Sequence, residues 1–309
     1  MRAIVTGGCG FIGSNLVEKL LDQGSHVIVY DNLHTGSLSN LTALKSKYSG
    51  DLEIFISKSY ASIQTFEDVD LIFHLGMPSS SPMFKEDPSL LSNVVLDAIQ
   101  IFEYAMRTNS KVIYASSSSL YNGNPLPFKE DMKIYVTDFY AESKYYIERL
   151  ARLYNELYGV SSIGLRLFSV YGKKERHKQN YANIVSQFLW RMLRDQPPVI
   201  FGDGTQSRDF IYVDDVTEAF ILAAKSSFDC EIFNVGTGVS YTFNEVVDLI
   251  NNMLGKNIKP KYVSNPISNY VYHTLADTSK SERLLGFKAR IDLRQGIEML
   301  LEEEAKCIM

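Results

Sequence analysis

Two residues suited to proton transfer, Tyr140 and Lys144, stand four positions apart in a segment with helical character. On a helix that spacing places a phenol and an ammonium group on one face. A free tyrosine has a pKa near ~10 and is a poor base at neutral pH. A positive charge close by favours the phenolate and lowers that pKa. The pair therefore predicts an acid/base that acts on an alcohol or a carbonyl group.

A run of four serines, residues 116–119, follows an apolar segment expected to be a strand over residues 111–115. In open α/β sheets, ligands bind beyond the carboxyl ends of the strands. A hydroxyl placed there could hydrogen-bond a substrate oxygen while Tyr140 takes the proton.

A glycine loop, with glycines at positions 7, 8, 10 and 13, follows a first apolar run and opens a helical segment. Such a loop lets the backbone approach a pyrophosphate at a helix N-terminus. Asp31 ends the next predicted strand, where it would accept hydrogen bonds from the adenosine ribose and repel a 2′-phosphate. Because no Lys or Arg lies between positions 31 and 44, NAD is favoured over NADP. The positive ring of oxidised NAD would further lower the pKa of Tyr140.

The elements that must position these residues form an alternating pattern. Strands are expected over residues 3–6, 26–30, 52–56, 71–75 and 111–115, mostly as continuous apolar runs, and a helix over 11–21. A further helix, 88–106, should have Asp87 as N-cap and Pro88 at its first position; another, 138–158, should stop at Gly159. Apolar strands between helices indicate an α/β fold of the Rossmann type, with a doubly wound parallel sheet.

After Arg166 the pattern changes to proline pairs, loops and shorter elements, such as helices over 214–224 and 243–253. We expect a dinucleotide-binding domain over residues 1–168 and a smaller α/β substrate lobe over 169–309. The two could be interleaved.

The composition excludes several classes of protein. The chain has 309 residues, 45% of them hydrophobic and 22% charged, with a formal net charge of −5. These values exclude a disordered chain and a disulfide-rich miniprotein. The mildly acidic charge balance does not indicate a nucleic-acid-binding protein. No apolar run is long enough for a membrane span and no signal pattern is present, so a cytoplasmic protein is expected.

Three scattered cysteines, Cys9, Cys230 and Cys307, predict free thiols and no metal site. A basic run over residues 173–178 is either a solvated loop or a surface that faces an anionic substrate.

Together these motifs resemble the extended short-chain dehydrogenases of the NAD-dependent epimerase/dehydratase family, over nearly the whole chain. The resemblance includes the stretches 6–14, 31–33, 74–76, 93–94, 210–215 and 276–280. It implies Tyr140 as acid/base, Lys144 as its partner and Ser117 as the catalytic hydroxyl. It implies cofactor contacts from Gly7, Gly10, Phe11, Ile12, Gly13, Asp31, Asn32, Thr35, Gly36, Leu75, Gly76, Asn93, Tyr140 and Lys144. Substrate contacts are implied for Ser117, Ser169, Arg208 and Thr274, with Arg208 on a diphosphate and Thr274 beside the sugar.

Within the family, 4,6-dehydratases carry Asp-Glu or Glu in the two positions after the catalytic hydroxyl. Here those positions are Ser118 and Ser119. The resemblance therefore implies a nucleotide-sugar 4-epimerase acting on UDP-glucose and UDP-galactose through a transient 4-keto sugar. Another dehydrogenase, reductase or decarboxylase of the family is the alternative, and a non-catalytic NAD-binding protein is a third.

Several positions depart from the family pattern. Leu96 and Asp97 replace Gly-Thr, Ser169 replaces Asn, and residues 57–59 replace a Gly-Asp strand end. Residues 267–271 lack a second diphosphate arginine, whose charge Lys173, Lys174, Arg176 or Lys178 could supply. The small Thr274 suggests tolerance of N-acetylated sugars. The resemblance and the two apolar faces of helix 138–158 imply a homodimer.

Overall fold

A seven-stranded parallel sheet forms the centre of this computed structural model, which describes residues 1–57, 60–265 and 270–308. In spatial order its strands are β10 (Cys230–Val235), β6 (Ser162–Leu167), β5 (Lys111–Ser117), β4 (Leu71–His74), β1 (Arg2–Thr6), β2 (His26–Asp31) and β3 (Leu52–Ile56). The five strands expected from the sequence all lie in this sheet, and each pairs in parallel with its neighbours.

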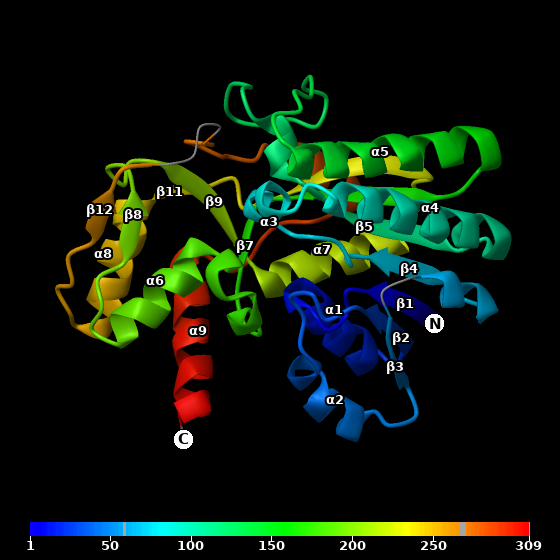
Figure 1. Cartoon of the computed structure of the whole chain (residues 1–309), viewed down its shortest axis with the longest axis horizontal. Helices are drawn as coiled ribbons and strands as arrows, with labels where there is room; N and C mark the ends of the chain where they lie inside the picture. The colour runs from blue at the N-terminus through cyan, green and yellow to red at the C-terminus, as the bar shows by residue number, and fades with distance from the viewer. Residues whose placement is uncertain (58–59, 266–269, 309) are drawn as a thin grey trace.

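Helices cover both faces of the sheet, which explains why its strands are apolar at successive positions (Figure 1). Ala3 and Val5 are buried in one cluster with residues of α1 (Phe11–Asp22) and α7 (Val213–Lys225). Ile4, between them, is buried in a second cluster with residues of α4 (Leu90–Thr108) and α5 (Phe139–Tyr158). Alternate side chains of one strand thus enter two separate cores.

The strand order reverses at β1. From β1 the chain moves through β2 to β3 on one side, while β4, β5, β6 and β10 extend the sheet on the other. Ligands of doubly wound sheets bind at the carboxyl edge of the strands beside such a reversal.

The helix that carries Tyr140 agrees with its prediction. Asp138 accepts a hydrogen bond from the backbone N–H of Ala141 at 2.7 Å, which caps the N-terminus of α5. Gly159, with a φ of 71°, ends the helix in the left-handed conformation. The phenol and the ammonium group are therefore held on a helix that is fixed at both ends.

Among the element boundaries that differ from expectation, two bear on the site. The predicted cap at Asp87 is wrong, because its carboxylate accepts from the backbone N–H (3.0 Å) and the hydroxyl (2.5 Å) of Ser89. These bonds close a turn over Pro88, so α4 begins at Leu90. Strand β5 continues to Ser117, because Ser116 and Ser117 still pair with β6.

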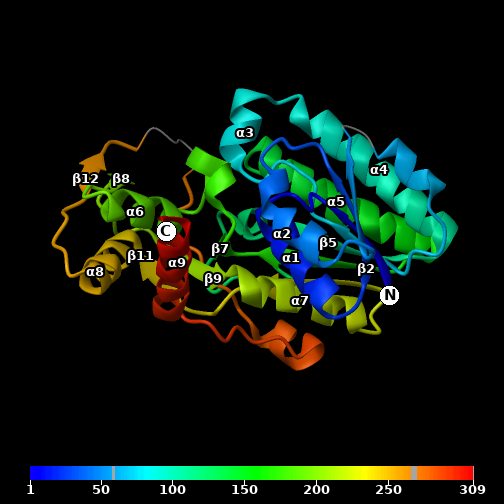
Figure 2. The same ribbon diagram turned by 90° about the horizontal axis from the view of Figure 1, so that it is seen from below.

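A second lobe beside the sheet contains the remaining larger elements (Figure 2). They are β7 (Ser169–Tyr171), α6 (Ile184–Leu193), β8 (Val199–Phe201), β9 (Ser207–Tyr212), β11 (Ser240–Thr242), α8 (Phe243–Leu254), β12 (Lys261–Val263) and α9 (Leu293–Ile308). Between β9 and β11 the chain returns to the first domain, where α7 covers the sheet and β10 forms its edge. We therefore propose that the dinucleotide domain comprises residues 1–168 together with α7 and β10.

The short helical segments are α2 (Thr42–Lys47), α3 (Ser81–Glu86), η1 (Leu38–Asn40), η2 (Ala61–Thr65), η3 (Ser118–Tyr121), η4 (Arg176–Tyr181) and η5 (Ser281–Leu285). Within the described ranges no helix is both long and apolar enough to cross a bilayer. Cys9 and Cys230 are free thiols, and the side chain of Cys307 lies outside the described part of the structure.

Candidate active site

A cleft of about 510 Å³ lies at the carboxyl edge of the sheet, where the two lobes meet. All of the residues predicted to bind cofactor or substrate line it: Gly7, Gly10, Phe11, Ile12, Gly13, Asp31, Asn32, Thr35, Gly36, Leu75, Gly76, Asn93, Ser117, Tyr140, Lys144, Ser169, Arg208 and Thr274. Residues from distant parts of the sequence thus meet in one place. Their individual roles remain predictions.

The glycine loop after β1 makes one wall of the cleft. Gly7 has a φ of +68°, and a Cβ on it would lie 2.7 Å from the Cα of Gly76 in the loop after β4. A Cβ on Gly13 would overlap the carbonyl oxygen of Gly7. No side chain caps the N-terminus of α1 at Gly10. The loop therefore needs glycine to form, and it presents a helix N-terminus suited to a pyrophosphate.

Asp31 closes the adjacent end of the cleft from the tip of β2. Its carboxylate accepts hydrogen bonds from the backbone N–H of Cys9 at 2.9 Å and of Leu33 at 2.7 Å. Burial raises the pKa of Asp31, and these backbone hydrogen bonds oppose that effect. The side chain is thus fixed between the glycine loop and the turn after β2, where a ribose hydroxyl could donate to it.

Tyr140, Lys144 and Ser117 come together at the opposite wall. The Nζ of Lys144 lies 5.6 Å from the centre of the Tyr140 ring and donates to the carbonyl oxygen of Ala115 at 3.0 Å. The Oγ of Ser117 accepts from the backbone N–H of Ser119 at 3.1 Å and is also hydrogen-bonded to the phenol of Tyr140. A hydroxyl can accept and donate at the same time, so Ser117 can donate its proton to the phenolate oxygen while it accepts from Ser119.

The pKa shifts of Tyr140 and Lys144 differ from the expectation that Lys144 lowers the pKa of the phenol. Burial raises the pKa of Tyr140 to about 12, with the Ser117 hydrogen bond lowering it and Asp138 raising it. Burial also lowers the pKa of Lys144 to about 7, although the carboxylate of Glu148 raises it. The lysine is desolvated and is itself close to losing its charge, so Lys144 alone does not make the phenol acidic. Acidification of Tyr140 requires the additional positive charge that oxidised NAD supplies when bound.

A buried ion pair between Glu148 and Arg166 links α5 to the strands beside it. Both oxygens of Glu148 accept from Arg166, at 2.8 and 2.7 Å, and Ser116 donates to the same carboxylate at 2.5 Å. Arg166 also donates to the hydroxyl of Tyr121 at 2.8 Å. This bidentate pair joins β5, β6 and α5, and it holds Ser117 and Lys144 in register.

The second lobe contributes the predicted substrate residues. Arg208 on β9 donates to the carbonyl oxygens of Val271 and Tyr272, at 2.5 and 3.0 Å, and the residue remains partly exposed at the cleft. The Oγ1 of Thr274 accepts from the backbone N–H of Asp209 at 3.2 Å. A guanidinium held by backbone carbonyls is oriented for a phosphate group without much loss of side-chain entropy.

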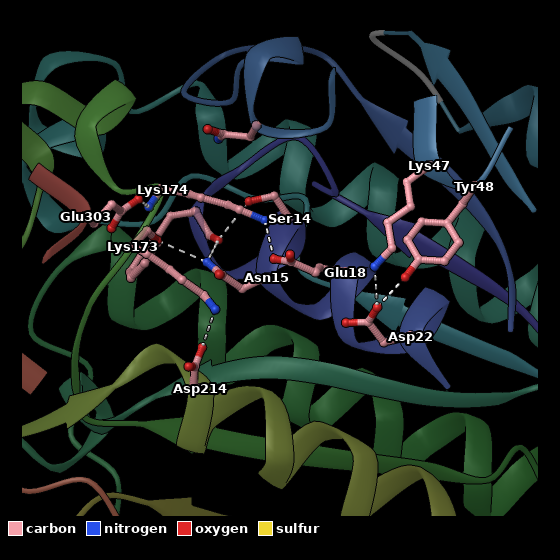
Figure 3. A network of polar contacts seen from close by, with 12 residues as sticks. Ser14, Asn15, Glu18, Asp22, Lys47, Tyr48, Lys173, Lys174, Asp214 and Glu303 are labelled. Atoms are coloured by element: carbon pink, nitrogen blue, oxygen red, sulfur yellow. Dashed lines mark hydrogen bonds and ion pairs between the residues drawn. The ribbon is translucent and has the colours of Figure 1, made fainter. Parts of the chain in front are cut away.

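Most of the basic run points away from the cleft. Lys173 forms an ion pair with Asp214 at 3.2 Å, and Lys174 pairs with Glu18 at 2.6 Å (Figure 3). Both lysines thereby fasten the second lobe to α7 and α1. Neither lines the cleft, so the structure does not support them as substitutes for a diphosphate arginine.

Lys178 is the exception in this run. Arg176 is paired with Glu304 and does not line the cleft, whereas Lys178 lines it. The Nζ of Lys178 lies 3.4 Å from Glu175 and 5.5 Å from the centre of the Phe11 ring, at the start of α1. Lys178 is therefore the member of the run that can reach an anion in the cleft.

Sequence reasoning did not assign several cleft residues, among them Met77, Pro78, Ser79, Leu90, Tyr181 and Asn183. The Tyr181 hydroxyl donates to Glu86 of α3 at 2.7 Å, so η4 spans from one lobe to the other. No sequence motif marks that contact. Of the departures noted in the sequence, residues 58, 59 and 267–269 lie outside the described residues.

The cleft as a whole fits NAD. Gly7 and Gly13 pack too closely on neighbouring backbone to carry a Cβ, so the loop lines the cleft with backbone alone, and Asp31 and Tyr140 line the same cleft. Within the part of the chain that the structure describes, no cluster of His, Cys, Asp and Glu could hold a metal ion. A doubly wound sheet with this loop and this Ser, Tyr and Lys arrangement defines a dinucleotide-binding enzyme of the short-chain dehydrogenase class.

Comparison with known proteins specifies the class further. UDP-N-acetylglucosamine 4-epimerase from Methanobrevibacter ruminantium superimposes with a TM-score of 0.90 at 32% identity, covering 98% of both chains. UDP-glucose 4-epimerase from Thermus thermophilus, solved with NAD, gives 0.87 at 28% identity, again covering 98% of both. UDP-glucuronic acid decarboxylase 6 of Arabidopsis thaliana is 29% identical over 312 residues, which is 98% of this chain and 88% of the relative.

The model of the NAD-dependent epimerase/dehydratase family matches residues 3–236, and the chain belongs to that family. The expected fold and the expected cofactor, NAD, are confirmed. The relatives differ in the sugar they are named for and in the reaction they carry out, so the family alone does not select the substrate.

Proposed function

We propose that this protein is a nucleotide-sugar 4-epimerase that interconverts UDP-glucose and UDP-galactose. The observation that carries the proposal is the meeting of Tyr140, Ser117 and Lys144 in the same cleft as the glycine loop. In that arrangement a sugar carbinol can contact an acid/base while NAD lies alongside it.

NAD, held by the glycine loop and Asp31, would supply the hydride acceptor for C4 of the sugar and, once reduced, the hydride donor for the opposite face of the 4-keto sugar. Tyr140 takes the proton of the C4 hydroxyl and returns it at the end of the cycle. Ser117, hydrogen-bonded to Tyr140, holds the sugar oxygen beside the phenol. Lys144, fixed on Ala115, keeps α5 against the serine strand.

The serines after Ser117 favour epimerisation over loss of water. Ser118 and Ser119 both line the cleft, and the Oγ of Ser119 is buried without a hydrogen-bond partner among the described residues. Elimination from a 4-keto sugar needs an acid to protonate the leaving hydroxyl, and a serine is too weak an acid for that role. Hydroxyl groups at this wall suit the hydroxyl groups of a neutral sugar.

Arg208 and Lys178 are the proposed ligands of the substrate diphosphate. Both line the cleft, and they approach it from different segments of the second lobe. Lys178 would supply the charge that the family's second arginine gives. Ser169 and Thr274 line the same cleft and are proposed contacts of the sugar. The small Thr274 leaves room for an N-acetyl group.

The test is a panel of nucleotide sugars incubated with the purified full chain and followed by proton NMR. The proposal predicts inversion at C4 of UDP-glucose or UDP-galactose, without net formation of NADH over many turnovers. Steady accumulation of NADH would instead identify a dehydrogenase. Tight NAD binding without turnover of any sugar would identify a non-catalytic binding protein.

A decarboxylase is the second candidate, because UDP-glucuronic acid decarboxylase 6 matches 98% of the chain. The first step is the same: oxidation at C4 of UDP-glucuronic acid gives a 4-keto acid, which can release carbon dioxide. The same NMR panel separates the two reactions, since decarboxylation converts a hexuronic acid into a pentose.

We retain the prediction of a homodimer through α5. Leu153 and Leu157 are 51% and 66% exposed on its outer side, and Leu96 on the adjacent α4 is 56% exposed. A partner copy would remove these side chains from water. Light scattering should give twice the chain mass for the wild type and the chain mass for Leu153→Glu.

A further inference from the structure

A second carboxyl group lines the cofactor cleft and has no partner among the described residues. Asp97 lies on α4 one turn after Asn93, and both residues line the cleft. In the described part of the chain Asp97 makes neither a hydrogen bond nor an ion pair. By contrast Asp31, the other acidic residue of the lining, accepts from two backbone N–H groups.

The electrostatics place Asp97 at the Asp31 half of the cleft. Burial raises the pKa of Tyr60, and both carboxyls raise it further; the Tyr60 hydroxyl donates to the carbonyl oxygen of Gly76 at 3.1 Å. Tyr140 and Lys144 respond to other carboxyls, Asp138 and Glu148 respectively. Asp97 therefore belongs to the end of the cleft where the adenosine of NAD is expected.

An unpaired carboxyl in this position is unfavourable for the protein alone. Burial raises the pKa of Asp97 to about 7, and no hydrogen bond or cation opposes the shift. Val94, which lies one turn before Asp97 on α4, is buried at 2% exposure, so one side of the Asp97 carboxyl adjoins the apolar core. A hydrogen-bond donor on a ligand would relieve this cost.

The adenosine half of NAD has two kinds of donor, the ribose hydroxyls and the 6-amino group of adenine. Asp31, at the tip of β2, is the proposed ligand of the ribose. We propose that Asp97 accepts a hydrogen bond from the 6-amino group of adenine and so selects adenine over 6-oxopurines. This role does not depend on which sugar is the substrate.

Cofactor binding tests the assignment without any measurement of activity. The full chain, stripped of nucleotide, would be titrated by calorimetry with NAD and with nicotinamide hypoxanthine dinucleotide, in which an oxo group replaces the amino group. Near pH 8 the wild type should bind NAD about ten- to a hundredfold more tightly, the usual effect of a hydrogen bond to a charged group. In Asp97→Asn the preference should fall to within about threefold, because an amide can both donate and accept.

Asp51→Asn is the matched control, since Asp51 is exposed on a turn away from the cleft. It should keep the wild-type preference. An unchanged preference in Asp97→Asn would overturn the proposal. A gain of NADP binding in that variant, with the base preference unchanged, would also overturn it, because Asp97 would then face the ribose.

Stability gives an independent readout. A raised pKa means that the folded protein holds a proton on Asp97 between about pH 4 and pH 7 that the unfolded chain releases. Stability from this group therefore falls as the pH rises through that window. Nucleotide-free Asp97→Asn should melt at a higher temperature than the wild type at pH 8 and at a similar one near pH 4. A lower melting temperature at pH 8 would show that Asp97 stabilises the protein, which contradicts a role toward a ligand.

Discussion

Lys144 donates a hydrogen bond from its Nζ to the carbonyl oxygen of Ala115, 3.0 Å away, and so ties the second turn of α5 to the C-terminal part of β5. Ser117 follows two residues after Ala115, and Tyr140 precedes Lys144 by one helical turn. The bond therefore sets the position of the phenol relative to the serine hydroxyl. Lys144 acts first as a structural link and, at a pKa of about 7, only weakly as a fixed charge.

Replacement of the phenol should separate chemistry from binding. Tyr140→Phe removes the group that takes and returns the C4 proton, so kcat should fall about 10²–10⁴-fold. The affinity for NAD, measured by calorimetry, should change far less than kcat, because Tyr140 is only one of the predicted cofactor contacts and the glycine loop and Asp31 are untouched. Tyr146→Phe on the same helix is the control, because Tyr146 does not line the cleft. Full activity in Tyr140→Phe would refute the assigned role.

The ionisation of Tyr140 should depend on the cofactor. Protein groups alone raise its pKa to about 12, so the nucleotide-free protein should show no tyrosinate from this residue near neutral pH. A positive nicotinamide ring stabilises the phenolate, so NAD should shift the ionisation toward neutral pH. The ultraviolet difference between wild type and Tyr140→Phe, titrated with and without NAD, isolates the residue from the other tyrosines. The same pKa in both states would contradict the mechanism.

Lys178, the residue of the basic run that lines the cleft, should contribute to substrate binding. Lys178→Ala should raise KM for the nucleotide sugar about ten- to a hundredfold, as loss of a charged hydrogen bond predicts, with a smaller change in kcat. Lys174→Ala is the matched control, because its ammonium group pairs with Glu18 outside the cleft. Steady-state kinetics would measure KM for the nucleotide sugar in both variants. Equal KM values in Lys178→Ala and Lys174→Ala would show that Lys178 does not bind the substrate.

The ion pair beneath the serine strand should matter for stability. Glu148→Gln leaves Arg166 as a buried charge without its counter-ion, so the free energy of unfolding in urea should fall by about 3–5 kcal/mol. The pKa of Lys144 should fall further, since the Glu148 carboxylate raises it. Glu142→Gln, which breaks an exposed pair with Arg149 on the same helix, should cost about 0–1 kcal/mol. Similar losses in both variants would show that the buried pair has no special role.

Much of the cleft could be predicted because its residues belong to local patterns. The glycine loop, Asp31 and the serine run each sit at the end of a strand whose apolar sequence is plain, and parallel strands bring their carboxyl ends to one edge. Helical spacing predicts that Tyr140 and Lys144 share one helix face, and the serine run and the glycine loop supply the context that makes the pair a candidate for catalysis.

The remainder depends on partners far away in the sequence. Four cations of the basic run look alike in the sequence. Three of them pair with Asp214, Glu18 and Glu304 outside the cleft, whereas Lys178 pairs with Glu175 and lines the cleft. The return of β10 to the first sheet is likewise set by tertiary packing. The pKa of Tyr140 escaped prediction because sequence spacing shows the nearby cation but not the burial that opposes its effect.

The most direct test of the central claim is the fate of the C4 hydrogen. UDP-glucose carrying deuterium at C4 would be incubated with the NAD-loaded full chain and followed by proton NMR. The account predicts UDP-galactose that keeps deuterium at C4, because the same hydrogen leaves and returns within the cleft. Failure to invert C4, or replacement of the deuterium by a solvent proton, would contradict it.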